Sequence, residues 1–242
     1  MSDGEVEFGE AWVYESIVAA IPGIDISRPL AVAIQLVAFE AGVVIAAWYY
    51  DLWTAAAAGT AAVVVAALGS AAMLRISALV RAERVPAAYR QVLFGSSIEV
   101  VLAVLAYVAL MTEVFVFAPQ RGEPSLIQTL LGPRPPVPAV ALTLLILWDV
   151  CYRIGTAWWA SVAALWRSAR FRFDPATARA LRRSDLEVVG FAAVQSLLLP
   201  FVVEQSLIVA VIVGHVVAVW TVAGLSAVLL TVQARGARAT GT

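Results

Sequence analysis

The chain has 242 residues and a formal net charge of -1, and it is 62% hydrophobic and only 14% charged. In a soluble domain about a quarter of the residues would be charged, so these values exclude an ordinary soluble protein and indicate a bilayer environment. The single cysteine, Cys151, excludes an intrachain disulfide, and with only one histidine beside it the chain cannot complete a cysteine-based metal site.

Apolar runs long enough to cross a bilayer as helices recur along the chain, since one crossing needs about 20 residues. An acidic segment, residues 1–27, comes first, and its stretch 8–21 has the mixed apolar and acidic character of an interfacial helix. The sequence therefore predicts an all-α fold, a polytopic membrane bundle over residues 28–234, with a short tail over 235–242. The six predicted transmembrane helices are 29–50, 53–74, 91–118, 138–166, 186–203 and 206–234.

All sixteen basic residues are arginine, and they are distributed unequally between the connections. Most of them lie after the second and fourth runs and in the C-terminal tail, whereas the opposite connections contain only Arg121 and Arg134. Because arginine-rich connections stay on the cytoplasmic side, we expect both termini in the cytoplasm and the chain in the cell membrane. The arginine-rich loops are expected to contact anionic lipid, and the acidic N-terminal segment suits a salt-loving archaeon.

Two capping signals predict helix starts on the cytoplasmic side. Asp174 followed by Pro175 predicts the N-cap and first turn of a basic helix that continues to Arg183. Ser184 with Glu187 three residues later matches a capping box, which predicts a separate helix start just before the fifth apolar run.

Two acids lie on one face of the third run. Glu99, Ala103, Ala106, Leu110 and Glu113 recur at helical spacing and therefore share a face. The small alanines beside Glu99 permit close approach of another helix, so we expect this acid to point into the bundle rather than at lipid. Glu113 lies near the outer end of the run, where it can reach water.

Ionisable residues also lie inside the fourth, first and sixth runs. Asp149 and Arg153 are four residues apart, in the acid-before-base order that suits a direct ion pair. Glu40 has no basic residue within a turn, so it is protonated, solvated in a cavity, or paired across helices with Arg153. His215 is either a neutral hydrogen-bonding residue between helices or a proton carrier. The Asp149–Arg153 pair fits a structural clasp and a functional site equally.

Several classes of enzyme and cofactor protein lack their sequence signatures here. The chain contains no His-Glu-x-x-His, no Gly-x-Ser-x-Gly and no glycine-rich phosphate loop, the marks of zinc proteases, serine hydrolases and nucleotide-binding proteins. It has no lysine to hold retinal, and one histidine is too few for paired haem ligands. We therefore expect no cofactor and no metal.

These features favour a transporter or channel-like protein for a small solute or a cation, with proton coupling through the buried carboxylates as one mechanism. The alternative is a non-catalytic membrane scaffold, a lipid-interacting protein or a complex-assembly subunit, whose buried charges are structural clasps. A lipid-modifying enzyme is a third class. The expected partners are the lipid bilayer and, in a homo-oligomer or membrane complex, another membrane chain; nucleic acid is not expected.

Overall fold

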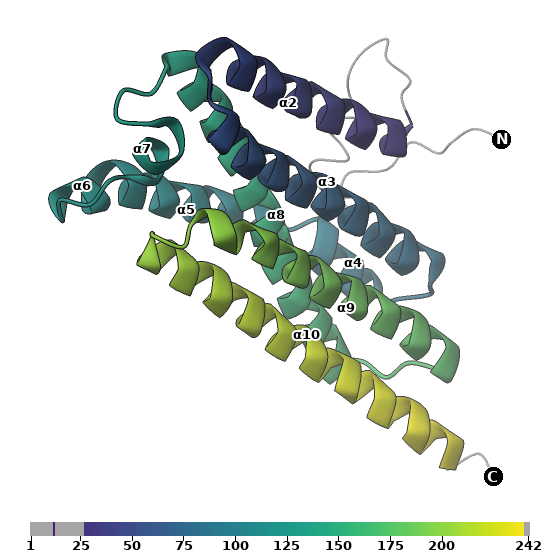
Figure 1. The fold of residues 1–242 in the computed structure, drawn as a ribbon. Coiled ribbons are helices and arrows are strands. Elements are labelled where there is room, and N and C mark those ends of the chain that lie inside the picture. The colour runs from purple at the N-terminus through teal and green to yellow at the C-terminus, as the bar shows by residue number, and fades with distance from the viewer. Residues whose placement is uncertain (1–11, 13–26, 240–242) are drawn as a thin grey trace.

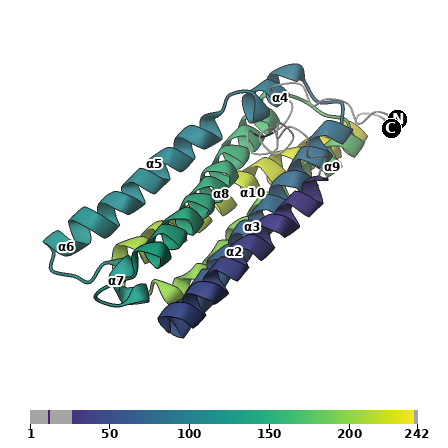
Figure 2. The same cartoon turned by 90° about the horizontal axis from the view of Figure 1, so that it is seen from above.

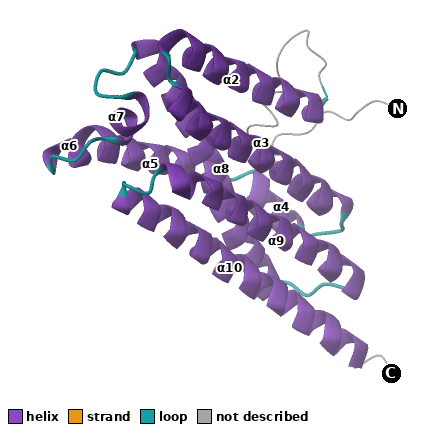
Figure 3. Ribbon diagram, in the orientation of Figure 1, coloured by secondary structure: helices purple, strands orange, loops and turns teal. Residues whose placement is uncertain are grey.

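The computed structural model describes Trp12 and residues 27–239, and every regular element in this part of the chain is a helix (Figures 1 and 3). The all-α prediction is therefore confirmed for the described residues. The interfacial helix predicted over 8–21 lies outside them, except for Trp12. The indole nitrogen of Trp12 donates a hydrogen bond to the backbone oxygen of Met73 at 3.3 Å, and its ring packs edge-on against Phe94.

Six helical stretches of the described chain are long and apolar enough to cross a membrane, in agreement with the six predicted spans. Four are single helices: α2 (Arg28–Tyr50), α3 (Trp53–Ala82), α8 (Val137–Arg170) and α10 (Ser206–Ala239). The third stretch joins α4 (Ala87–Phe94), α5 (Ile98–Thr112), the π-helical turn η1 (Glu113–Phe117) and α6 (Ala118–Gln120). The fifth joins α9 (Pro175–Gln195) to the 3-10 turn η2 (Ser196–Phe201), and the short helix α7 (Leu126–Leu131) precedes α8.

The long helices run back and forth between two ends of the bundle. We call the end with the connections 83–86 and 171–174 the arginine-rich end, and the end with 51–52, 121–136 and 202–205 the arginine-poor end. Figure 2 shows the helices side by side, with α8 inside the bundle and α2 at its edge. Helix α8 contacts α2, α3, α5, α9 and α10, so it touches every other span; α9 also packs directly against α10, and α3 against α2 and α9.

Helices of several spans extend further toward the arginine-rich end than their hydropathy predicts; α10, for instance, ends at Ala239 where the predicted limit is 234. Helix α3 ends at Ala82, α8 ends at Arg170 and α9 begins at Pro175, where the predicted limits are 74, 166 and 186. Arginine is a good helix former with a long apolar stem, so these helices continue where the hydropathy falls. The arginines that were expected in loops but lie on helices are Arg75, Arg81, Arg90, Arg167 and Arg170. Arg179, Arg182 and Arg183 lie on α9, in agreement with the basic helix predicted to continue to Arg183.

The start of α9 confirms one capping prediction and contradicts the other. The Asp174 carboxylate accepts hydrogen bonds from the backbone N–H groups of Ala176 (2.9 Å) and Thr177 (3.1 Å), which makes Asp174 the N-cap. The Thr177 hydroxyl also donates to Glu83 at 2.9 Å, which ties this start to the end of α3. The capping box predicted at Ser184 is wrong, because α9 runs through this position and Ser184 is buried by packing.

Small residues let α5 and α8 approach closely. A side-chain carbon added at Gly155 of α8 would lie 2.8 Å from the backbone nitrogen of Ala103 and 3.0 Å from the backbone oxygen of Glu99. Both Glu99 and Ala103 are fully buried. The predicted inward orientation of Glu99, with a neighbouring helix close to it, is therefore confirmed.

The outer surface of the bundle is apolar. On α5, the side chains of Val101, Leu105 and Val108 are each more than half exposed. Exposed apolar side chains of this kind are solvated poorly by water and well by lipid chains. Together with the six helices of spanning length, this surface indicates a multi-pass membrane protein.

Candidate functional site

The predicted ion pair of α8 is present near the middle of that helix. A guanidinium nitrogen of Arg153 lies 3.0 Å from a carboxylate oxygen of Asp149, and the Arg153 side chain is fully buried while that of Asp149 is 13% exposed. The other Asp149 oxygen accepts a hydrogen bond from the Gln35 amide of α2 at 2.8 Å. Arg153 also donates to the sulfur of Met73 on α3 at 3.4 Å. The pair thus joins three helices.

Glu40 does not pair with Arg153, so the pairing across helices, one of the three alternatives for this acid, is not formed. The Thr60 hydroxyl of α3 donates to one of its carboxylate oxygens at 2.8 Å, and the other oxygen is buried without a partner in the described chain. The physical reason is the registry of α2, which places Gln35 rather than Glu40 beside Asp149. Only one of the two carboxylate oxygens of Glu40 therefore has a hydrogen-bond partner.

His215 is separate from the acids. Its ring lies 6.5 Å from the Trp158 ring of α8, tilted by 56°, and its Nε2 atom is buried without a partner among the described residues. Of the five predicted residues, the structure joins Asp149 and Arg153 directly, whereas Glu40 is bonded to Thr60 and His215 lies beside Trp158. A single site formed by all five is thus absent from the described chain.

A cavity of about 320 Å³ lies in the arginine-poor half of the bundle, between α3, α5, α7, α8, η2 and α10. Its volume is in the range of small-molecule sites. Almost all of its walls are hydrocarbon, and the polar side chains that reach it are Glu113, Thr143 and Cys151. Representative apolar lining residues are Ala58, Ala106, Ile146, Val150, Leu198 and Ile208.

The cavity opens at the side of the bundle. Leu207 and Val211 of α10 line it, and they are 48% and 62% exposed, so the cavity reaches the surface that faces lipid. Its deep wall is formed by α8, where Val150 and Cys151 are both only 4% exposed. An apolar molecule in the bilayer can therefore approach from the α10 side and reach the centre of the bundle.

A charged cluster lies at the arginine-poor end of this cavity. Glu113 lines the cavity and is 6% exposed. The expectation that it reaches water at the outer end of its helix is therefore wrong. It belongs to the π-helical turn η1, and such turns often occur at functional sites. Arg121 pairs with Glu113 and, at 2.9 Å, with Glu123. Its hydrogen bonds to Glu113 and then Glu123 raise the pKa of Arg121 further above its ordinary value, so Arg121 stays a cation.

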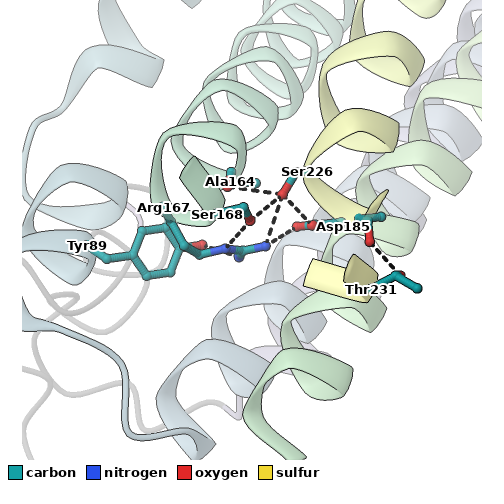
Figure 4. Close-up of polar contacts among 8 residues, drawn as sticks. Tyr89, Ala164, Arg167, Ser168, Asp185, Ser226 and Thr231 are labelled. Atoms are coloured by element: carbon teal, nitrogen blue, oxygen red, sulfur yellow. Dashed lines mark hydrogen bonds and ion pairs between the residues drawn. The ribbon is translucent and has the colours of Figure 1, made fainter. Parts of the chain in front are cut away.

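A second buried ion pair, which sequence reasoning missed, lies near the arginine-rich end (Figure 4). A guanidinium nitrogen of Arg167 on α8 lies 2.6 Å from a carboxylate oxygen of Asp185 on α9, and both side chains are almost completely buried. Another Arg167 nitrogen donates to the hydroxyl of Tyr89 on α4 at 2.9 Å. The Ser226 hydroxyl of α10 donates to the second Asp185 oxygen at 2.7 Å.

This cluster, which we call the Arg167 clasp (Tyr89, Arg167, Ser168, Asp185 and Ser226), ties four helices together. Ser168 and Ser226 lie 2.8 Å apart through their hydroxyls, and every polar atom of the ion pair has a partner. A fully hydrogen-bonded buried pair fixes helix positions and leaves no free group for a ligand. Its arrangement is therefore structural.

One signal in the sequence pointed toward Arg167. The face of α8 that carries Asp149, Arg153, Thr156 and Ala160 continues at the same three- and four-residue spacing to Arg167. The end assigned to the hydrophobic run excluded Arg167 from the helix, and nothing in the pattern links it to Asp185 on another helix.

Comparison with known proteins identifies one family. A model described as a family of unknown function (DUF7530) matches residues 7–226, which is most of the chain. No curated protein and no solved structure matches the chain. The site must therefore be interpreted from its own geometry.

Proposed function

The chain belongs to the family DUF7530, whose function is unknown, and we propose that it is a lipid-interacting protein of the cell membrane. In this proposal both termini are cytoplasmic, and the cavity of the arginine-poor half holds a hydrocarbon chain of a lipid or lipid-like molecule. The observation that carries the proposal is the apolar cavity of about 320 Å³, open at the lipid-facing surface.

The lining of the cavity favours a hydrocarbon ligand. A charged or strongly polar solute would lose its hydration in this cavity without gaining hydrogen bonds, which costs several kcal/mol. A hydrocarbon chain has no polar hydration to lose, and it makes van der Waals contacts with the walls of a cavity that would otherwise be empty. The walls therefore select for apolar molecules.

The charged cluster of Glu113, Arg121 and Glu123 supports an amphipathic ligand. It lies where the cavity meets the arginine-poor end, so a polar head placed there remains near water while the chain lies inward. The Arg121 side chain is 42% exposed, and its cation is paired with two carboxylates, so the cluster is net negative and suits a neutral or cationic head group. The proposed ligand thus has one hydrocarbon chain and one polar head.

A monoacylglycerol, whose head group is neutral, with a diazirine at the chain end tests the proposal in lipid nanodiscs. Illumination is expected to cross-link it to Val150 or Cys151, which lipid outside the bundle does not reach. Ala106→Phe places a ring in the cavity and should abolish these cross-links. The matched control is Ala41→Phe, at an exposed position of α2, which should leave them unchanged. Cross-links confined to outward side chains such as Leu105, unaffected by Ala106→Phe, would refute the proposal.

Proton or cation transport is the second candidate, and one observation favours it. Asp149 and Gln35 line a small cavity of about 10 Å³, room for about one water molecule, and Glu40 keeps a buried oxygen without a partner in the described chain. A buried carboxylate with a free oxygen can take up a proton or a cation.

Flux measured in proteoliposomes tests this candidate. If the acids form a path, pH-driven proton or cation flux should appear with the unchanged chain and disappear with Glu40→Gln or Asp149→Asn. The control variant Glu123→Gln lies in the connection 121–136, away from these acids, and should keep the flux. No flux across a panel of cations and pH gradients would exclude the transporter.

A further inference from the structure

A groove of about 570 Å³ lies between α3 and α9, toward the arginine-rich end and apart from the apolar cavity. Figures 1 and 2 show these two helices side by side. Each contributes one face at helical spacing, so charged and apolar side chains alternate along the groove. Helix α3 contributes Arg75, Leu79 and Ala82, and α9 contributes Arg183, Leu186 and Glu187.

The groove has an excess of positive charge. Arg75 forms an ion pair with Glu187 at 2.8 Å, yet the Arg75 side chain is still 69% exposed, so part of its guanidinium faces the groove. Arg183 is exposed and has no acidic partner among the described residues. Two guanidinium groups against one carboxylate leave a net positive charge. Arginine is suited to phosphate, because its planar donors bind two oxygens at once.

The depth of the groove matches the level of lipid phosphates. Arg75 lies 22 residues beyond Trp53, the first residue of α3 at the opposite end. At 1.5 Å per residue this is about 33 Å, close to the hydrocarbon thickness of about 30 Å. Arg75 is therefore at the boundary between hydrocarbon and head groups when Trp53 lies at the other boundary.

Apolar surface adjoins the charged part of the groove. Leu186 is 55% exposed and Leu68, two turns from Arg75 toward the middle of α3, is 45% exposed. Gly190 of α9, one turn beyond Leu186, has no neighbouring side chain within 4 Å of an added carbon. A hydrocarbon chain that extends from the groove toward the middle of the membrane thus meets apolar surface and open space.

We propose that this groove binds an anionic phospholipid, with its phosphate between Arg75 and Arg183 and an acyl chain along Leu186 and Leu68. The inference is independent of the apolar cavity. The net positive charge favours an anionic head group over a zwitterionic one, whose amine would be repelled by the second arginine. Each arginine near a charged membrane surface strengthens lipid binding about fivefold.

Lipid counting by native mass spectrometry tests the inference on the full chain, stripped of lipid in detergent. Titration with dioleoyl phosphatidylglycerol is expected to give binding at least about fivefold tighter than dioleoyl phosphatidylcholine. Arg75→Gln and Arg183→Gln should each weaken phosphatidylglycerol binding about fivefold. The matched control is Arg134→Gln, an exposed arginine at the arginine-poor end, which should not change it.

Glu187→Gln separates lipid binding from a structural role of the Arg75–Glu187 pair. If the groove binds phosphate, removing the competing carboxylate frees Arg75 and should tighten phosphatidylglycerol binding. A merely structural pair would lower the melting temperature in this variant without tightening lipid binding, and that result would overturn the inference. Equal affinity of the unchanged chain for both lipids, or full affinity in Arg75→Gln and Arg183→Gln, would also overturn it.

Discussion

At the scale of single residues, Arg167 and Asp185 form the most completely buried ion pair in the described chain, with side-chain exposures of 0% and 1%. Arg167→Met removes one charge and leaves the Asp185 carboxylate in the protein interior with Ser226 as a remaining donor. Stranding a buried charge in this way costs about 3–5 kcal/mol. We expect the free energy of unfolding in mixed micelles to fall by about this amount.

Two further variants determine whether the stranded charge causes that loss. Arg167→Met combined with Asp185→Leu removes both charges, so most of the stability should return. Arg172→Gln, at an exposed position between α8 and α9, should change the free energy of unfolding by no more than about 0.5 kcal/mol. A double variant as unstable as Arg167→Met would show that packing, not charge, is lost.

Arg153→Met should cost less than Arg167→Met, although both arginines are fully buried. The partner Asp149 is 13% exposed, keeps the hydrogen bond from Gln35, and adjoins space for about one water molecule. Its charge is therefore better solvated than that of Asp185 when the arginine is absent. Thermal unfolding of both variants in one detergent compares them, and an equal or larger loss for Arg153→Met would contradict this ranking.

At the scale of secondary-structure elements, the contact between α5 and α8 depends on Gly155. Gly155→Ala adds a carbon within 3.0 Å of the α5 backbone, so the two helices have to separate. Overpacking of this kind costs about 1–3 kcal/mol. Gly190→Ala is the matched control on α9, where an added carbon meets no neighbour within 4 Å. We expect Gly155→Ala to lower the melting temperature and Gly190→Ala to keep or raise it; equal effects would contradict the close contact.

The sequence predicts the helices better than it predicts their ends and contacts. Hydropathy locates six spans because each needs a long apolar run, and helical spacing correctly orients Glu99 and pairs Asp149 with Arg153. The arginine-rich ends of α3, α8 and α9 were missed, because their helices continue through charged residues stabilised by packing. Asp185 and the π-helical turn at Glu113 depend on neighbouring helices, which periodicity within one helix does not identify.

At the scale of the whole molecule, the Arg167 clasp and the apolar cavity lie in opposite halves of the bundle. The Arg167 clasp fixes α4, α8, α9 and α10 near the arginine-rich end, and the Asp149–Arg153 pair joins α2, α3 and α8. The apolar cavity lies in the half away from the Arg167 clasp, where no comparable hydrogen-bonded cluster joins α5 to α10 among the described residues. In the proposed function, the hydrogen-bonded clasp holds the helices in place at one end while the opposite half admits the ligand between helices.

Orientation in the membrane can be tested with two exposed arginines at opposite ends of the bundle. In a Cys151→Ala background, Arg134→Cys places a thiol at the arginine-poor end and Arg172→Cys places one at the arginine-rich end. Arginine-rich segments remain cytoplasmic, so a membrane-impermeant maleimide should label Arg134→Cys in intact cells and Arg172→Cys only after permeabilisation. The reverse result would invert the orientation. Labelling of both in intact cells would contradict an arrangement in which these connections lie on opposite sides of one membrane.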